Sequence, residues 1–305
     1  MKNVLILLST YNGEKYIEEQ IQSYLVQKGI KCDLLVRDDG SSDATLSIIK
    51  KYADKFSKLR IIKGKNMGYA GSFMALIRQA YSLEQKYDYY ALSDQDDVWL
   101  ADKLYIATDR LSRFDSRKPQ LYFSQTQLVD SRLNYIATPR LKLKCTFGES
   151  FVVFGATGCT EVFNYELLKI VSTHVKVLPK VRHDAWIYQT CLAFDGAVFF
   201  DTQPHILYRQ HRSNVIGRKT AKKTWFRRFN YLFSKGKNSR LESTKDFYRN
   251  FETVLPDKHK KLLAGIVNYK TDYINRVKLL FNKDLTTKNV KTNLRFRIAL
   301  LLGLY

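Results

Sequence analysis

The chain opens with short apolar runs that alternate with segments of helical periodicity. Val4–Thr10 is a continuous apolar run that ends in polar residues, which is typical of a strand buried on both faces of a parallel sheet. Apolar residues then recur at helical spacing over 17–25, and Gly29 follows as a stop signal. The alternation recurs three times and predicts strands over 32–38, 59–64 and 87–94 and helices over 46–56, 73–80 and 104–111.

The pattern changes after about residue 118. Strands are expected over 119–129 and 197–211, separated by long irregular segments. From about Gly217 the pattern is helical, and one amphipathic stripe is expected from Leu262 to Leu280. The whole pattern predicts the α/β class, with a doubly wound, mostly parallel sheet and a C-terminal helical extension.

Charge is distributed unevenly over the 305 residues. We place a boundary near 216–220, which separates a first domain, 1–217, from a basic, amphipathic helical region, 218–305. The second part carries 22 Lys and Arg residues and six acidic ones, a net charge of +16, while the first part carries +6. This asymmetry indicates an anionic partner, either a membrane surface or nucleic acid.

Two segments of the basic part interleave apolar residues with cations, Lys222–Phe233 and Asn293–Tyr305. They are expected to lie on an anionic bilayer. The structural alternative is a helical subdomain packed on the first domain with its cations solvated, and the two are not exclusive. No apolar run reaches ~20 residues, so no transmembrane helix is expected, and the amino-terminal run is a poor signal peptide. The four cysteines form no CxxC pair and are expected to be reduced and without chemistry. We therefore expect a cytoplasmic protein, peripheral on the inner face of the cell membrane.

Polar clusters follow three of the predicted strands. They are Ser9–Asn12, Asp38–Ser41 and Asp94–Asp97. A single acidic triplet is more often a solvated turn, but the carboxyl ends of parallel strands share one edge of the sheet, where ligands bind in open α/β folds. Three converging clusters therefore predict a binding site.

The type of ligand follows from which motifs are present. A dinucleotide fingerprint and a P-loop are both missing. Carboxylates in a DxD arrangement can hold Mg²⁺ or Mn²⁺, and the cation in turn binds a diphosphate. A bound cation would also explain how three neighbouring carboxylates tolerate one another.

Five stretches of the chain, in this order, resemble the family 2 glycosyltransferases, which have the GT-A fold of nucleotide-diphospho-sugar transferases. They are STYNGEKY, RDDGSSDAT, SDQDDVWLADKL, HDAW and YRQHRSNVIG, and they span about the first 217 residues. The combination is most similar to bacterial rhamnosyltransferases that build cell-wall or capsular polysaccharide. The resemblance implies inverting, metal-dependent transfer of a sugar to a lipid-linked glycan. It favours dTDP-rhamnose as donor and leaves UDP-sugars open.

The resemblance also implies residue roles on the donor side. The residues assigned to the nucleotide sugar are Thr10, Tyr11, Asp39, Asn66, Gly68, Asp94 and Arg209. Those assigned to Mg²⁺ or Mn²⁺ are Asp96, Asp97 and His211. The structural alternatives are strand ends for Thr10 and Tyr11, a turn for Asp39, an ordinary loop for Asn66 and Gly68, a helix cap for Asp97, a surface charge for Arg209 and a structural histidine for His211.

On the acceptor side, transfer needs a carboxylate that removes the proton of the incoming hydroxyl. The resemblance implies that Asp184 is this base, although an HD pair by itself more often caps a helix. It assigns acceptor contacts to His183, Trp186 and Gly158, for which the alternatives are core packing and an ordinary loop.

Two rival functions remain from the residues. A basic nucleic-acid-binding protein would share the charge, but acidic clusters on the ligand edge would repel phosphate and no nucleic-acid motif is present. A nucleotidyltransferase of related fold would share the nucleotide, the metal and the sheet, but would lack the base at Asp184.

Overall fold

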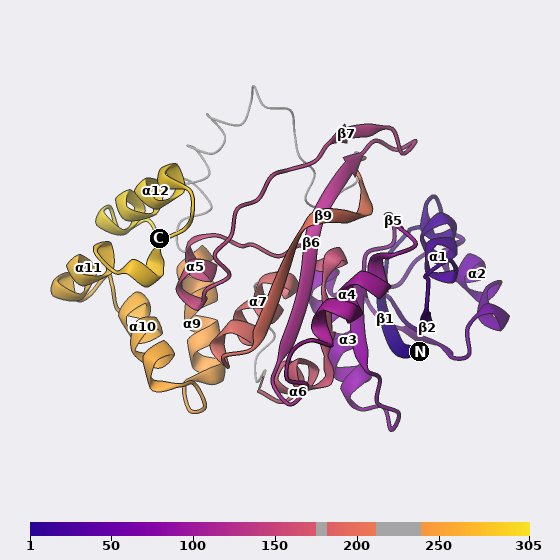
Figure 1. Ribbon diagram of the computed structural model, residues 1–305, viewed down its shortest axis with the longest axis horizontal. Helices are drawn as coiled ribbons and strands as arrows, with labels where there is room; N and C mark the ends of the chain where they lie inside the picture. Colours follow the sequence, from indigo (N-terminus) through magenta and orange to yellow (C-terminus); the bar gives the residue numbers. More distant parts are fainter. Residues whose placement is uncertain (175–181, 212–238) are drawn as a thin grey trace.

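The computed structural model of the chain describes residues 1–174, 182–211 and 239–305. Within these residues one nine-stranded sheet runs through the molecule in the order β3-β2-β1-β4-β8-β6-β9-β5, and β7 pairs with β6 (Figure 1). The strands are β1 Lys2–Thr10, β2 Ile30–Asp38, β3 Leu59–Lys63, β4 Tyr89–Ser93, β5 Val98–Trp99, β6 Gln120–Val129, β7 Tyr135–Ala137, β8 Val162–Asn164 and β9 Ala197–Arg209.

Most strands run in one direction. β1 is parallel to β2 and β4, and β2 is parallel to β3. β8 is antiparallel to both β4 and β6, so β6 and its parallel partner β9 point the same way as β1. Only β5, β7 and β8 run the other way among the described strands. The predicted mostly parallel sheet is confirmed, and the three reversed strands, of two or three residues each, were too short for a pattern to reveal.

Helices cover both faces of the sheet. Alternate residues of β1 enter two different cores, because successive side chains of a strand point to opposite faces. Ile6 packs with α1, α2 and α4, while Leu7 packs with α3, α6 and α7. The helices are α1 Ile17–Leu25, α2 Thr45–Lys50, α3 Gly68–Tyr81, α4 Lys103–Leu111, α5 Phe147–Val152, α6 Tyr165–His174, α7 His183–Ala193, α9 Ser239–Phe251, α10 Asp257–Val267, α11 Tyr273–Leu280 and α12 Val290–Leu301. Short 3₁₀ turns lie at Ala53–Lys55, Gly158–Thr160 and Lys283–Leu285.

Two expectations about helices were wrong. The segments between β6 and β9, expected to be irregular, contain α5, α6 and α7. The single stripe expected over 262–280 is two helices, α10 and α11, because the chain turns between them. Asp272 caps the second helix by accepting a hydrogen bond from the Asn275 amide, and this leaves Tyr273 exposed.

The C-terminal helices share a core with the first part of the chain. Phe247 and Phe251 of α9 pack on Trp186 of α7, with ring centroids 5.0 and 5.7 Å apart. The Tyr305 hydroxyl donates to the Phe151 carbonyl of α5 over 3.1 Å. The packed-subdomain alternative therefore describes these helices, while the boundary predicted near 216–220 and the segment Lys222–Phe233 lie outside the described residues. Across the described ranges we find no helix that is both long and apolar enough to cross a bilayer.

Candidate active site

Hydrogen bonds tie the end of β1 to the end of β2. Thr10 Oγ1 donates to Asp38 Oδ2 over 3.0 Å, and the Asp39 amide donates to the Thr10 carbonyl over 2.8 Å. Asp38 Oδ1 accepts from the amides of Gly40 and Ser41, at 3.1 and 2.9 Å. Asp38 therefore forms the turn, and Asp39 is the carboxylate left for another role.

Asp39 connects this turn to the loop before α3. Its buried carboxylate pairs with Arg37 and accepts a hydrogen bond from the Met67 amide over 3.0 Å. In the same loop, Asn66 Oδ1 accepts from the Gly68 amide over 2.9 Å. Gly68 has a φ of +71°, a left-handed conformation that glycine adopts without strain. The structure thus brings three of the predicted donor residues together.

Tyr11 and Gln95 join the first polar loop to the acidic one. The Tyr11 amide donates to Gln95 Oε1 over 2.9 Å, and Gln95 Nε2 donates back to the Tyr11 carbonyl over 3.0 Å. A Cβ at Gly13 would lie 2.3 Å from the same oxygen, so only glycine allows this approach. The Tyr11 ring is exposed, which leaves it available to a ligand.

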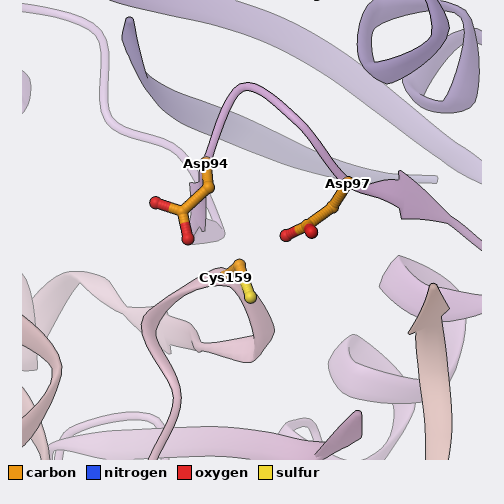
Figure 2. Close-up of side chains that lie close together, drawn as sticks. All are labelled: Asp94, Asp97 and Cys159. Atoms are coloured by element: carbon orange, nitrogen blue, oxygen red, sulfur yellow. The ribbon is translucent and has the colours of Figure 1, made fainter. Parts of the chain in front are cut away.

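Three side chains converge at the acidic loop. Asp94 leaves the end of β4, Asp97 precedes β5, and Cys159 faces both from the 3₁₀ turn (Figure 2). One ligand atom from each lies within 4.8 Å of the others. Asp97 is buried: its Oδ1 accepts from the Arg209 amide over 3.0 Å, and its Oδ2 accepts no hydrogen bond within the described residues.

Desolvation and like charges dominate the electrostatics here. Desolvation, then the charges of Asp96 and Asp184, raise the pKa of Asp94 to about 7. Burial, with Asp96 and Asp94, raises the pKa of Asp97 well above its ordinary value. Burial likewise raises the pKa of the Cys159 thiol, which favours the neutral thiol over the thiolate.

A buried lysine lies beneath this cluster. Lys103 Nζ donates to the Cys159 carbonyl over 2.9 Å and sits 3.2 Å from the centroid of the Trp99 ring. Burial lowers the pKa of Lys103 to about 7, while the charges of Asp97 and Asp94 oppose that shift. When it is protonated, Lys103 is therefore placed to offset negative charge in the acidic loop.

The three predicted metal ligands fall into two groups. Asp96 Oδ2 and His211 Nε2 are 2.8 Å apart, and both side chains are partly exposed. Asp97 instead points toward Asp94 and Cys159 (Figure 2). A carboxylate and an imidazole suit Mn²⁺, and a carboxylate suits Mg²⁺. The accessible pair Asp96 and His211 fits a cation that must also reach a ligand phosphate, whereas the other group is deep and contains a neutral thiol.

Arg209 holds the acidic loop from behind. Its Nε donates to the Asp96 carbonyl and its Nη1 to the Ser131 carbonyl, both at 2.8 Å, and Nη2 pairs with Glu19. The guanidinium also lies 4.5 Å from the centroid of the Tyr16 ring. Only 1% of the residue is exposed, so the expected surface-charge alternative is wrong, and direct contact with a diphosphate stays a prediction.

The candidate base lies in the first turn of α7. Asp184 Oδ1 accepts from Arg182 Nε over 3.0 Å and from the Ala185 amide over 2.7 Å, and Arg182 Nη2 contacts Oδ2. His183, which precedes Asp184, lies against Gly158, and the adjoining Cys159 faces the acidic loop, so the start of α7 is next to that loop. The charge of Asp184 accordingly contributes to the raised pKa of Asp94.

The predicted acceptor residues have different positions. His183 stacks on Phe73 with ring centroids 4.0 Å apart, and a Cβ at Gly158 would lie 2.4 Å from its Nε2. Burial lowers the pKa of His183 to about 4, so the imidazole is neutral, and its ring nitrogens make no hydrogen bond within the described residues. Trp186 is fully buried in the core, so the expectation of a sugar contact there is wrong and the packing alternative holds.

Four residues of this site were missed by sequence reasoning: Gln95, Lys103, Glu161 and Arg182. Each has a contact or burial that only the fold creates. Glu161, for example, is completely buried with both carboxylate oxygens unpartnered within the described part of the chain. A signal did exist for Lys103, since it occupies a position that continues the apolar face of α4 with Leu104 and Ala107.

Comparison with known proteins adds independent information. A family model described as Glycosyl transferase family 2 matches residues 5–169. The dTDP-rhamnosyl transferase RfbG of Shigella flexneri is 31% identical over 242 residues, which cover 75% of this chain and 80% of that protein. An uncharacterized glycosyltransferase of Mycoplasma pneumoniae, the MG025 homolog, is 25% identical over 196 residues, 63% of this chain and 60% of that protein.

Solved structures share the fold. The crystal structure of S. aureus TarS 1-349 in complex with UDP-GlcNAc aligns over 100% of this chain and 93% of that one, with a TM-score of 0.57 and 16% identity. The structure of TarS 1-349 in complex with UDP aligns with a TM-score of 0.53 over 99% and 92% of the two chains, again at 16% identity.

Proposed function

The chain belongs to glycosyl transferase family 2 and is a glycosyltransferase with the GT-A fold, and from this premise we propose that it transfers rhamnose from dTDP-rhamnose, with inversion, to a lipid-linked glycan acceptor in cell-wall or capsular polysaccharide synthesis. One observation carries the proposal: the loops after β1, β2 and β4 are hydrogen-bonded into a single edge, and the start of α7, which contains Asp184, lies against the turn that faces the acidic loop. The rhamnosyl relative supports the choice of donor.

In this proposal the nucleotide part of the donor lies against residues of the three loops and of the segment that leads into α3. Thr10 and the exposed ring of Tyr11 border the base and ribose position, with Asp39 at its inner end. Asn66 and Gly68 lie in the segment that leads into α3, where the Gly68 amide donates to the Asn66 side chain. Asp94, which is partly exposed, would contact ribose or diphosphate oxygens by donating its proton when it is protonated, or through a cation when it is ionised.

A divalent cation would be held by Asp96 and His211, with Asp97 behind them. When bound, Mg²⁺ or Mn²⁺ supplies positive charge that stabilises the departing nucleoside diphosphate. In this proposal Arg209 does not contact the diphosphate. It positions the acidic loop instead, because its hydrogen bonds to the Asp96 and Ser131 carbonyls keep that loop in one conformation.

The reaction is a single displacement. The acceptor hydroxyl oxygen attacks the anomeric carbon, the bond from that carbon to the diphosphate oxygen breaks, and the hydroxyl proton passes to the Asp184 carboxylate. Arg182 orients that carboxylate through two hydrogen bonds. The imidazole of His183 is neutral and buried beside Gly158, so it would reach an acceptor hydroxyl only after its surroundings move. No covalent enzyme intermediate is required.

The partners of the enzyme follow from charge. We propose an acceptor carried on a membrane lipid and an enzyme that works at the inner face of the cell membrane, because the basicity is concentrated in residues 218–305. Residues 1–217 would then carry out catalysis, and residues 218–305 would attach the enzyme to the membrane.

The experiment that tests the proposal is a donor panel. Purified full-length chain is incubated with dTDP-rhamnose and a series of UDP-sugars, with Mn²⁺, Mg²⁺ or EDTA, and release of nucleoside diphosphate is measured. We expect dTDP-rhamnose to be consumed fastest and only with a cation. Preference for a UDP-sugar would overturn the donor assignment. Turnover in EDTA at the same rate would overturn the proposed requirement for a divalent cation.

A further inference from the structure

One face of α12 is apolar and exposed. Val290, Leu294, Ile298 and Leu301 are spaced by four, four and three residues, so they line one side of the helix. Their exposed fractions are 80, 59, 45 and 55%. The opposite side of α12 is buried through Phe296 and Leu300, so the exposed stripe is a second apolar face.

The neighbouring helix α11 and its C-cap residue carry a similar group. Tyr273 and Ile274 of α11 and the C-cap residue Phe281 are 74, 68 and 76% exposed. α11 and α12 contact each other and lie at the end of the molecule opposite to α1 and α2 (Figure 1). Single exposed apolar residues are normal on proteins, but a group of this size on two adjacent helices marks an interaction surface.

Cations border this apolar group. Lys291, Arg295 and Arg297 on α12 are exposed and form no ion pair within the described residues. Across 268–305 the chain has eight Lys and Arg residues against two acidic ones. An apolar face edged by cations is the pattern of a helix that lies in the interface of an anionic bilayer.

A lysine-lined hollow adjoins the same surface. It has a volume of about 330 Å³ between α10 and α11, and Lys258, Lys261 and Lys278 line it together with Asp284. Lys278 follows exposed Ile274 by four residues, so the two are neighbours on α11. The net positive lining suits a phosphate group.

We propose that α11 and α12 form a docking face for an anionic bilayer, with Val290, Leu294 and Ile298 entering the lipid and the lysine-lined hollow receiving a lipid phosphate headgroup. The inference rests on the proposed function for its purpose, since docking would bring the enzyme to a lipid-linked acceptor. α12 packs on α5, and α5 packs on α7, which starts at the candidate base. Docking would therefore hold the catalytic edge at a constant orientation to the membrane.

The charge pattern favours a bilayer over other occupants. In a second copy, the same cations would face one another around the apolar stripe, which like-charge repulsion disfavours. Nucleic acid would use the cations but would leave four aliphatic side chains of α12 without a partner. A bilayer with anionic headgroups uses both features at once.

The test is flotation of the full-length chain with vesicles of phosphatidylcholine alone or with added phosphatidylglycerol. We expect binding to the anionic vesicles, and Leu294→Gln with Ile298→Gln should weaken it by roughly tenfold or more, because two buried aliphatic contacts are lost. Ile136→Gln, on β7 and similarly exposed, is the matched control and should bind normally. Equal binding to neutral vesicles, or unchanged binding by the double variant, would overturn the proposal.

Charge and headgroup are tested separately. Arg295→Gln with Arg297→Gln should weaken flotation and reduce its salt dependence. Lys258→Gln with Lys278→Gln should also weaken flotation if the hollow holds a lipid phosphate. Inorganic phosphate should then displace wild type from the vesicles at lower concentrations than it displaces this variant. Equal displacement of the two proteins would show that the hollow binds no headgroup and would overturn that part of the proposal. A dimer in light scattering that Leu294→Gln with Ile298→Gln converts to a monomer, without change in flotation, would assign the face to a second copy.

Failure of docking is distinguishable from failure of the proposed function. Cation-dependent release of nucleoside diphosphate from dTDP-rhamnose, measured without vesicles, should be equal in wild type and in all docking variants. Donor turnover without flotation would refute the docking face alone. Flotation without turnover of any nucleotide sugar would refute the proposed function and leave the face as a membrane surface.

Discussion

At the scale of single residues, the site depends on carboxylates that differ in their partners. Asp38 is used by its own turn, Asp39 is paired with Arg37, and Asp184 is held by Arg182 at the start of α7. The same residue type therefore serves structure or chemistry according to what surrounds it, and only the partners distinguish the two.

Asp184→Asn tests the proposed base. The amide cannot accept the acceptor proton, so we expect transfer to fall by ~10²–10⁴-fold while donor binding is retained. Transfer is measured with dTDP-rhamnose and acceptor, and donor binding by calorimetry. Turnover near that of wild type would show that another group is the base.

Asp96→Asn tests the cation position. In wild type, dTDP with Mn²⁺ at 100 times its Kd should stabilise the folded state by about 2.7 kcal/mol, which is measured as a rise in the melting temperature. We expect the variant to lose this effect, because its cation ligand is gone, and Cys159→Ser to keep it, because the thiol is neutral. If instead Asp97→Asn loses the effect and Asp96→Asn keeps it, the cation belongs to the deeper group.

At the scale of elements, β9 connects the sheet to the site. The strand ends at Arg209, and its middle contacts α4 through His205, whose Nδ1 is 3.1 Å from Asp102 and whose Nε2 is 3.5 Å from Asp201. The long pairing of β9 with β6 therefore positions Arg209 behind the acidic loop.

This contact predicts a pH dependence of stability. Burial by itself would lower the pKa of His205, but hydrogen bonds to Asp201 and Asp102 outweigh it and raise the pKa. Because the folded-state pKa is raised, the stabilisation is complete below the unfolded pKa of about 6.5 and is lost as the pH rises through the folded pKa. His205→Gln should flatten the fall in unfolding free energy above pH ~6.5, measured by urea titration at several pH values. An unchanged pH profile would contradict the contact.

At the scale of the whole molecule, the C-terminal helices are part of the catalytic body. α9 packs on α7 through Trp186, and the last residue, Tyr305, bonds to α5. A surface on α11 and α12 is therefore mechanically connected to the helix that carries Asp184.

Trp186→Ala should loosen this connection. Removing a fully buried indole from between α7 and α9 should cost ~3–5 kcal/mol of unfolding free energy. Tyr135→Ala, which removes an exposed aromatic ring from β7, is the control and should change stability by less than ~0.5 kcal/mol. A variant of normal stability with a raised KM for the acceptor would restore the sugar-stacking alternative.

The sequence by itself determined the repeating strand–helix units, the mostly parallel sheet and the meeting of three polar loops at one edge. These features depend on local periodicity and on the rule that parallel strands end on the same side, and both can be read from neighbouring residues. The resemblance of the motifs added the family, which the family model and the relatives confirm.

Only the tertiary structure decided which polar residue contacts which. The position of Lys103 beneath the acidic loop and that of Trp186 in the core depend on residues far away along the chain. The separation of Asp96 from Asp97 depends on two such partners, His211 for Asp96 and the Arg209 amide for Asp97. The short strands β5, β7 and β8 also depend on the tertiary structure, because they form by pairing with longer strands and have no periodicity of their own. Desolvation and pairing act across space, so a one-dimensional pattern contains no record of them.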